Sequence, residues 1–142
     1  MSGESTKERV LAVLEDDAQA SYEQIASAAN VSKPTVRKYI NQLEDEGVIV
    51  GYSADIDPKK LSTVSISLTG IDVESERFLE VTDTLKALDS VESLYSSSGD
   101  HMLLAEIRGS DGEAVGQVIR NEILSIDGVT AAHPCFLQER LK

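Results

Sequence analysis

The spacing of apolar residues changes at Asp57-Pro58-Lys59-Lys60-Leu61, a segment that fits neither a helical nor a strand pattern. Before this segment apolar residues recur every three to four positions, which predicts helices. Directly after it, residues 64–69 alternate strictly between apolar and polar side chains, which predicts a half-buried strand. The change predicts two small domains, residues 1–50 and 63–142, joined by a linker strand and loop at residues 51–62.

The pattern beyond residue 63 predicts the element order β-α-β-β-α-β. Strands are expected at 64–69, 91–97, 102–108 and 129–141, with helices at 75–88 and from Ser110 to Ile123. Ser98 to His101 form the turn of a hairpin, and Pro134 predicts an edge position or a bulge in the last strand. The fold class is therefore α+β, with a ferredoxin-like C-terminal domain. Its two helices cover one face of the sheet, and the other face is expected to expose Ile, Leu and Val for pairing with another subunit.

The N-terminal domain is predicted to be a helix-turn-helix. Capping boxes, in which a hydroxyl residue precedes Glu or Gln by three positions, begin at Ser5 and Ser21, and a third at Ser110 begins the second helix of the C-terminal domain. Asn30-Val31 forms the turn, and Ser32 caps a third helix that ends at Gly47. A strand is expected from Val48 to Ile56.

The third helix has two different faces. Val36, Ile40 and Leu43 have the spacing of a buried stripe, whereas Lys33, Arg37 and Asn41 form a polar line with Thr35 and Lys38 beside it. Residues 30–43 contain three basic and no acidic residues, although the chain has 25 Asp+Glu and a net charge of −12. One interpretation is an ordinary solvated helix face. The other is a major-groove reader, with the candidate DNA-binding residues Ser32, Lys33, Pro34, Thr35, Arg37, Lys38 and Asn41.

Each residue type suits a particular part of the DNA. Arg37 can form two hydrogen bonds with a guanine edge and Asn41 can do so with an adenine edge, while Lys33 or Lys38 can contact phosphate. The Ser32 hydroxyl and the amides at the helix N-terminus can also hold a phosphate. Tyr39 is expected to pack against the domain core rather than stack on a base.

The acidity of the chain has two interpretations. A polyanion repels nucleic acid, which argues against DNA binding. Carboxylates scattered over the whole chain also suit a surface adapted to very high salt, where a Debye length of about 3 Å at 1 M removes long-range repulsion. The even scatter favours the high-salt interpretation.

Several other classes of protein are disfavoured. No apolar run is long enough to span a bilayer and the N-terminus is polar, so a cytoplasmic protein without a membrane segment is expected. The single Cys135 is expected to be packed or half-packed. His101 and His133 lie far apart in the sequence, and Asp100 with His101 offers only two ligands, so no metal site is predicted. The sequence shows no nucleophile–base pair and no Gly-rich phosphate loop, so neither an enzyme nor a cofactor is expected.

Five segments together resemble the Lrp/AsnC (leucine-responsive, feast/famine) family of transcription regulators, with composition typical of a halophilic archaeon. They are Ala20–Ala26, Val31–Val36, Leu43–Tyr52, Asp57–Leu61 and Ser98–Leu104. The resemblance covers nearly the whole chain and is most specific at Leu43-Glu44-Asp45-Glu46-Gly47-Val48-Ile49-Val50-Gly51-Tyr52.

The resemblance implies a sequence-specific regulator that binds double-stranded DNA at a pseudo-palindromic site. It implies a homodimer that can assemble further into tetramers or octamers, with Val48–Ile56 pairing with its two-fold mate. It also implies an amino-acid or related effector bound near Ser98, Gly99, Asp100, His101 and Met102. Met102 stands where the family often has Asp, so the resemblance fixes neither the identity nor the existence of the effector. One alternative is an oligomeric amino-acid sensor that acts through protein contacts and binds little DNA.

Overall fold

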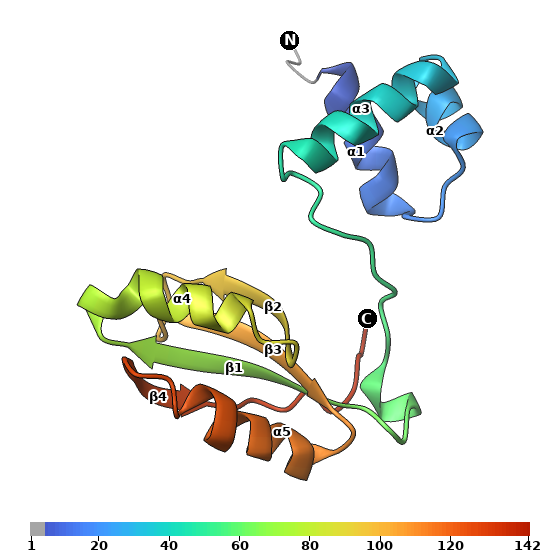
Figure 1. Ribbon diagram of the computed structural model, residues 1–142. Helices are drawn as coiled ribbons and strands as arrows, with labels where there is room; N and C mark the ends of the chain where they lie inside the picture. Colours follow the sequence, from blue (N-terminus) through green and yellow to red (C-terminus); the bar gives the residue numbers. More distant parts are fainter. Residues whose placement is uncertain (1–4) are drawn as a thin grey trace. The chain divides into compact units, whose positions relative to one another are not determined.

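A computed structural model describes residues 5–142, and the chain divides after Asp55 into two compact units. The first unit contains three helices, α1 (Thr6–Asp16), α2 (Tyr22–Ala29) and α3 (Lys33–Asp45), drawn in blue to green in Figure 1. Within residues 5–142, every helix is too short or too polar to cross a membrane.

Local capping sets the ends of these helices as predicted. The Ser5 hydroxyl accepts from the Glu8 amide and the Ser21 hydroxyl accepts from the Gln24 amide, and both capping boxes are complete. Asn30 ends α2 in the left-handed conformation (φ 57°), which Asn tolerates better than most residues. The helices enclose a core of buried side chains: Val10, Leu14, Ile25, Ala26, Ala29, Val36 and Ile40.

The strand predicted from Val48 to Ile56 is not formed within one chain. The amides of Val48 and Ile49 both donate to the Leu43 carbonyl and so complete the end of α3. From Ile49 to Asp57 the described chain has no helix or strand. A strand needs a ladder of backbone hydrogen bonds to a neighbouring strand, and the sheet within residues 5–142 contains only β1 to β4.

The second unit has the predicted β-α-β-β-α-β order. After a 3-10 turn at Pro58–Lys60 come β1 (Ser65–Val73), α4 (Phe78–Lys86, preceded by a 3-10 turn at Ser75–Arg77), β2 (Val91–Ser96), β3 (Leu103–Gly109), α5 (Gly112–Val118, continued by a π-helical turn at Ile119–Ile123) and β4 (Val129–His133). The strand order β2-β3-β1-β4 is antiparallel throughout (Figure 1). The ferredoxin-like fold is therefore confirmed.

Both helices of this unit pack on the same face of the sheet. The shared core joins Ile71 of β1 and Ile107 of β3 to Leu85 of α4 and Ile123 beyond α5, all of them fully buried. We call the opposite side the helix-free face, to which the intervening residues of β1 and β3 belong. It carries Leu68, Leu104 and Tyr95, but also Asp72, Glu106, Arg108 and His133. The expectation of exposed Ile, Leu and Val is therefore met only in part: Leu68 and Leu104 lie on this face and Ile66 is buried there, but polar residues alternate with the apolar ones across neighbouring strands.

Three local expectations in this unit differ from the structure. Asp111, not Ser110, caps α5, because its carboxylate accepts from the Ala114 amide at 2.8 Å. The last strand ends at His133, since Pro134 cannot donate to the ladder, but the chain continues along the edge of the sheet through mutual Leu68–Cys135 backbone bonds. The edge position predicted by Pro134 is confirmed. Cys135 is exposed rather than packed, because it lies on this edge opposite Leu68.

Candidate functional site

The polar face of α3 is presented to solvent. The stripe of Val36, Ile40 and Leu43 is buried as predicted. Six of the seven candidate DNA-binding residues are exposed and Thr35 is half-buried; the exposed ones are Ser32, Lys33, Pro34, Arg37, Lys38 and Asn41. The helix therefore separates a core face from a face that carries basic and amide groups.

The N-terminus of α3 is locally ordered. The Ser32 hydroxyl accepts from the Thr35 amide at 3.4 Å and lies 2.9 Å from the Thr35 hydroxyl. Pro34 occupies the first turn, where a missing N–H removes no helical hydrogen bond. Because the first amides of a helix have no partners within the helix, their N–H groups can donate hydrogen bonds to a phosphate oxygen.

The basic side chains of α3 are not neutralised within the described chain. Lys33, Arg37 and Lys38 form no ion pair with any carboxylate among residues 5–142. The chain as a whole carries a net charge of −12, with 25 Asp+Glu against 13 Lys+Arg. The free charges remain available for an external anion.

Tyr22 is a candidate site residue that the sequence did not single out. The Arg37 guanidinium lies over the Tyr22 ring, 5.2 Å from its centroid, and so links the start of α2 to the middle of α3. A guanidinium that stacks on an aromatic face keeps its N–H groups free for hydrogen bonding. Tyr39, in contrast, packs against the domain core as predicted.

Acidic residues gather at the far end of α3 and have partners there. The Tyr52 hydroxyl donates to the Glu44 carboxylate at 3.0 Å, and Lys7 forms an ion pair with Glu46. Partial burial, followed by this hydrogen bond to Glu44, raises the pKa of Tyr52 above its ordinary value. These contacts hold the segment after α3 against the helical unit, away from the basic N-terminal half of α3.

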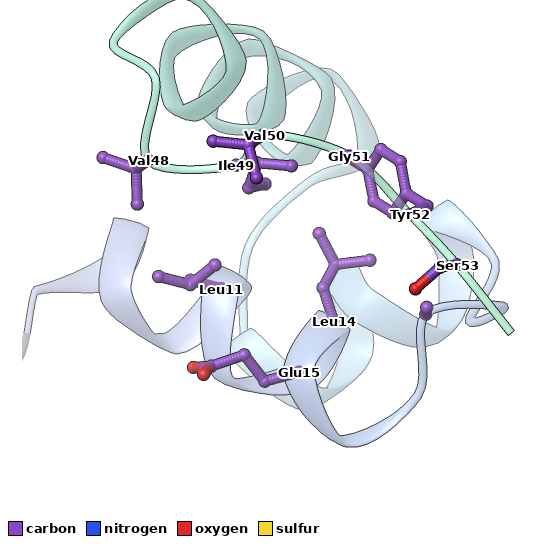
Figure 2. A pocket seen from close by; sticks show the side chains of 10 residues that line it. Leu11, Leu14, Glu15, Val48, Ile49, Val50, Gly51, Tyr52 and Ser53 are labelled. Carbon is purple, nitrogen blue, oxygen red and sulfur yellow. The ribbon is translucent and has the colours of Figure 1, made fainter. Parts of the chain in front are cut away.

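The same segment lines an apolar cleft of about 440 Å³ within the first unit. Figure 2 shows Val48 to Ser53 on one side and Leu11, Leu14 and Glu15 of α1 on the other. Val50 is 94% exposed, whereas Tyr52 is half exposed and tied to Glu44. The backbone here is therefore held in place while its apolar side chains remain accessible.

The hairpin between β2 and β3 separates the candidate effector residues into two groups. Ser98, Gly99 and Asp100 are exposed at the tip. His101 and Met102 are half-buried, and Met102 packs against the sheet core while its amide donates to the Asp72 carboxylate at 3.3 Å. The structure therefore does not bring all five residues into one concave site.

Asp72 and His133 join His101 on the helix-free face, and the sequence pointed to neither of them. His101 Nδ1 lies 3.2 Å and His133 Nε2 3.5 Å from the same oxygen, Asp72 Oδ2. The pKa of Asp72 is lowered, first by the hydrogen bond to His101, against a smaller opposing effect of partial burial. These side chains come from β1, the hairpin and β4, which are adjacent only in the folded sheet.

Two family descriptions match the chain and together cover most of it. Residues 4–50 match "winged helix-turn-helix DNA-binding", and residues 64–142 match "Lrp/AsnC ligand binding domain".

Curated relatives agree with this assignment over the whole length. The chain is 71% identical to HTH-type transcriptional regulator LrpA1 of Halobacterium salinarum, covering 100% of both proteins, and 42% identical to LrpA of Pyrococcus abyssi, covering 94% of both. Among solved structures, a transcriptional regulator from Neisseria meningitidis in complex with L-Met has the same fold, with a TM-score of 0.67 at 19% identity over 99% of this chain and 93% of that one.

The exposed polar face of α3, the ferredoxin-like second unit and these matches lead to one assignment. The chain belongs to the Lrp/AsnC family of helix-turn-helix transcription regulators, which combine a DNA-binding domain with a ligand-binding domain.

Proposed function

We propose that this regulator binds a pseudo-palindromic site on double-stranded DNA as a homodimer, with α3 of each protomer in the major groove. In this proposal residues 1–50 read DNA, residues 51–62 link the domains and residues 63–142 sense an effector and assemble the oligomer. The observation that carries the proposal is the exposed polar face of residues 32–41, within a run of 14 residues (30–43) that contains no carboxylate. A two-fold dimer presents two such helices, so the preferred site should contain two inverted half-sites about one helical turn apart.

The seven candidate DNA-binding residues have proposed roles of three kinds: base contact, phosphate contact and formation of the helix start. Arg37 forms two hydrogen bonds with a guanine edge and Asn41 does so with an adenine edge, while Lys33 and Lys38 contact phosphates. Ser32, Pro34 and Thr35 form the helix start, whose amides face the backbone of the DNA. Basic groups near the helix N-terminus and the amide one turn further along suit a helix that enters the groove by its N-terminal end.

Selection from a random DNA library by the full-length protein tests this proposal. Enrichment of an inverted repeat, bound in gel shifts by a dimer or a larger even oligomer, is the expected result. Absence of DNA binding from low salt to molar KCl would instead favour the oligomeric amino-acid sensor that acts through protein contacts.

Dimer formation through residues 48–53 is supported by a backbone that belongs to no sheet within residues 5–142. A second copy of the same segment could pair with it and cover the exposed side chain of Val50. We expect Val50→Asp to weaken the dimer and DNA binding together, because two carboxylates would face one another across the two-fold axis. Analytical ultracentrifugation checks this, with Leu79→Asp on the exposed side of α4 as a control for an added charge. Unchanged assembly of Val50→Asp would exclude this segment from the interface.

An amino acid or a related small metabolite is the proposed effector. The matched ligand-binding domain and the L-Met complex of the Neisseria structure support it. The proposed contacts are Ser98, Gly99 and Asp100 at the hairpin tip, with His101 and Met102 behind them. Calorimetric titration of the full-length protein with a panel of amino acids tests this role, and heats indistinguishable from dilution for every one would oppose it.

High salt is expected to stabilise the protein. With a net charge of −12, mutual repulsion opposes the folded state at low ionic strength, and screening removes it. The 71% identical relative from Halobacterium salinarum agrees with a high-salt origin. We expect the midpoint of thermal unfolding to rise between 0.1 and 2 M KCl, because the Debye length falls from ~10 Å to under ~3 Å over this range. An unchanged midpoint would contradict this.

Because DNA binding takes place where DNA is, the proposed location is the cytoplasm.

A further inference from the structure

We propose that Asp72, His101 and His133 bind one divalent transition-metal ion of the Zn²⁺ class on the helix-free face of the C-terminal sheet. Each residue offers one ligand atom, and the three atoms lie within 4.8 Å of one another. Two imidazoles and one carboxylate are a common protein ligand set for Zn²⁺ and its neighbours in the first transition row.

The distances are close to those that coordination requires. Ligand atoms bound at about 2.0–2.1 Å in a tetrahedron lie about 3.3 Å from one another. The Asp72 oxygen lies 3.2 Å from His101 Nδ1 and 3.5 Å from His133 Nε2. All three ligand atoms lie within 4.8 Å of one another, so a bound ion would draw the two imidazole nitrogens together to complete three corners, and a water molecule would supply the fourth.

The arrangement differs from an ordinary carboxylate–imidazole hydrogen bond. Two imidazole nitrogens face the same Asp72 oxygen, and the two rings stack with centroids 4.6 Å apart and planes 23° apart. If both imidazoles carried a proton on each nitrogen, two cations would be in contact across this stack. A single metal ion satisfies the carboxylate and both nitrogen lone pairs at once.

Gly70 makes room for the cluster. It lies on β1 opposite His133, and a side chain there would place its Cβ 2.3 Å from His101 Cδ2. Only glycine therefore lets the His101 ring lie across β1 beside Asp72. The backbone is shaped around this ring, which indicates a built site rather than a chance meeting of exposed side chains.

The ligands come from separate segments, so bound metal would join them. Asp72 belongs to β1, His133 to β4 and His101 to the hairpin whose tip carries the proposed effector contacts. The ion would fix the base of this hairpin to the sheet. This inference concerns residues that the proposed DNA and effector roles do not require, apart from His101.

Titration of the metal-free full-length protein with ZnCl₂, followed by the NMR signals of its imidazoles, tests the proposal directly. The chain contains only two histidines, and both belong to the site. Both signals are expected to shift together and to saturate at one Zn²⁺ per chain, with Mg²⁺ causing no shift because it prefers oxygen ligands. Movement of one histidine alone, or of neither, would overturn the proposal.

Substitutions give a second, independent measurement. Competition with a chromophoric chelator should show at least ~100-fold weaker Zn²⁺ binding for Asp72→Asn, His101→Gln and His133→Gln, since loss of even an outer-shell partner costs about 10–100-fold. Asp89→Asn makes the same charge change at an exposed position outside the cluster and should leave affinity unchanged. So should Cys135→Ser, which removes the only thiol. Gly70→Ala should weaken binding without removing a ligand, because it displaces the His101 ring. Wild-type affinity in Asp72→Asn and both histidine variants would refute the site.

Discussion

Arg37→Ala is expected to weaken binding to the preferred DNA site by about 1–3 kcal/mol per half-site, roughly 5- to 150-fold, and to relax the base preference at the position it reads. Arg37 is exposed in the middle of α3, has no carboxylate partner in the described chain, and is held over the Tyr22 ring. Quantitative gel shifts on the selected site and on variants with one changed base pair measure both effects.

Neighbouring residues provide matched controls. Lys38→Ala removes one charge from the same helix and should weaken binding to all sequences alike, with a shallower dependence of log K on log salt. Arg37→Lys keeps the charge but loses the bidentate hydrogen bonds to the base, so it should resemble Arg37→Ala in base preference. Because Arg37 is exposed, each variant should unfold like the wild type.

The Tyr22 ring should contribute through Arg37. Tyr22→Phe retains the ring and is expected to bind normally, whereas Tyr22→Ala should cost about 0.5–1 kcal/mol, the strength of an exposed cation–π contact. In the Arg37→Ala background, Tyr22→Ala should have no further effect. If Arg37→Ala weakens binding equally on every DNA sequence, Arg37 is a phosphate contact and another residue reads the base.

Features that depend on near neighbours could be predicted from the sequence. The capping boxes at Ser5 and Ser21, the buried stripe of Val36, Ile40 and Leu43, and the exposed line beside it all follow from spacings of three to four residues. The order of strands and helices in the second unit followed from where apolar residues alternate and where they recur every three to four positions. Even so, Ser110 and Asp111 are both good caps, and only the folded geometry chose Asp111.

Contacts between distant segments could not be predicted. Asp72, His101 and His133 meet only because the order β2-β3-β1-β4 places β4 and the hairpin on either side of β1. Local periodicity reveals the faces of β1 but not which residue lies across from Gly70. For Tyr22, the sequence showed only the capping box at Ser21, because the ring contacts a helix that begins eleven positions later.

Gly128→Ala is expected to destabilise the C-terminal domain by roughly 2–5 kcal/mol. Gly128 has φ +105°, a conformation that L side chains rarely adopt, and an added Cβ would lie 2.9 Å from Val81 Cγ2 and 3.0 Å from Arg77 Cβ. Backbone strain and overpacking each cost about 1–3 kcal/mol. Its carbonyl also accepts from the Glu74 amide at 2.8 Å, so relief of the clash would break the contact that leads into α4.

Residue-resolved hydrogen exchange on the full-length protein measures this loss for each domain separately. Protection should fall in β1 to β4 and stay unchanged in α1 to α3, because the chain divides into two compact units. Gly99→Ala is the matched control in the same domain, since its Cβ would meet only Ser97 Oγ at an ordinary 3.5 Å. Equal loss of protection in both units would show that they unfold cooperatively. Wild-type protection in Gly128→Ala would mean that the turn before β4 adapts at little cost.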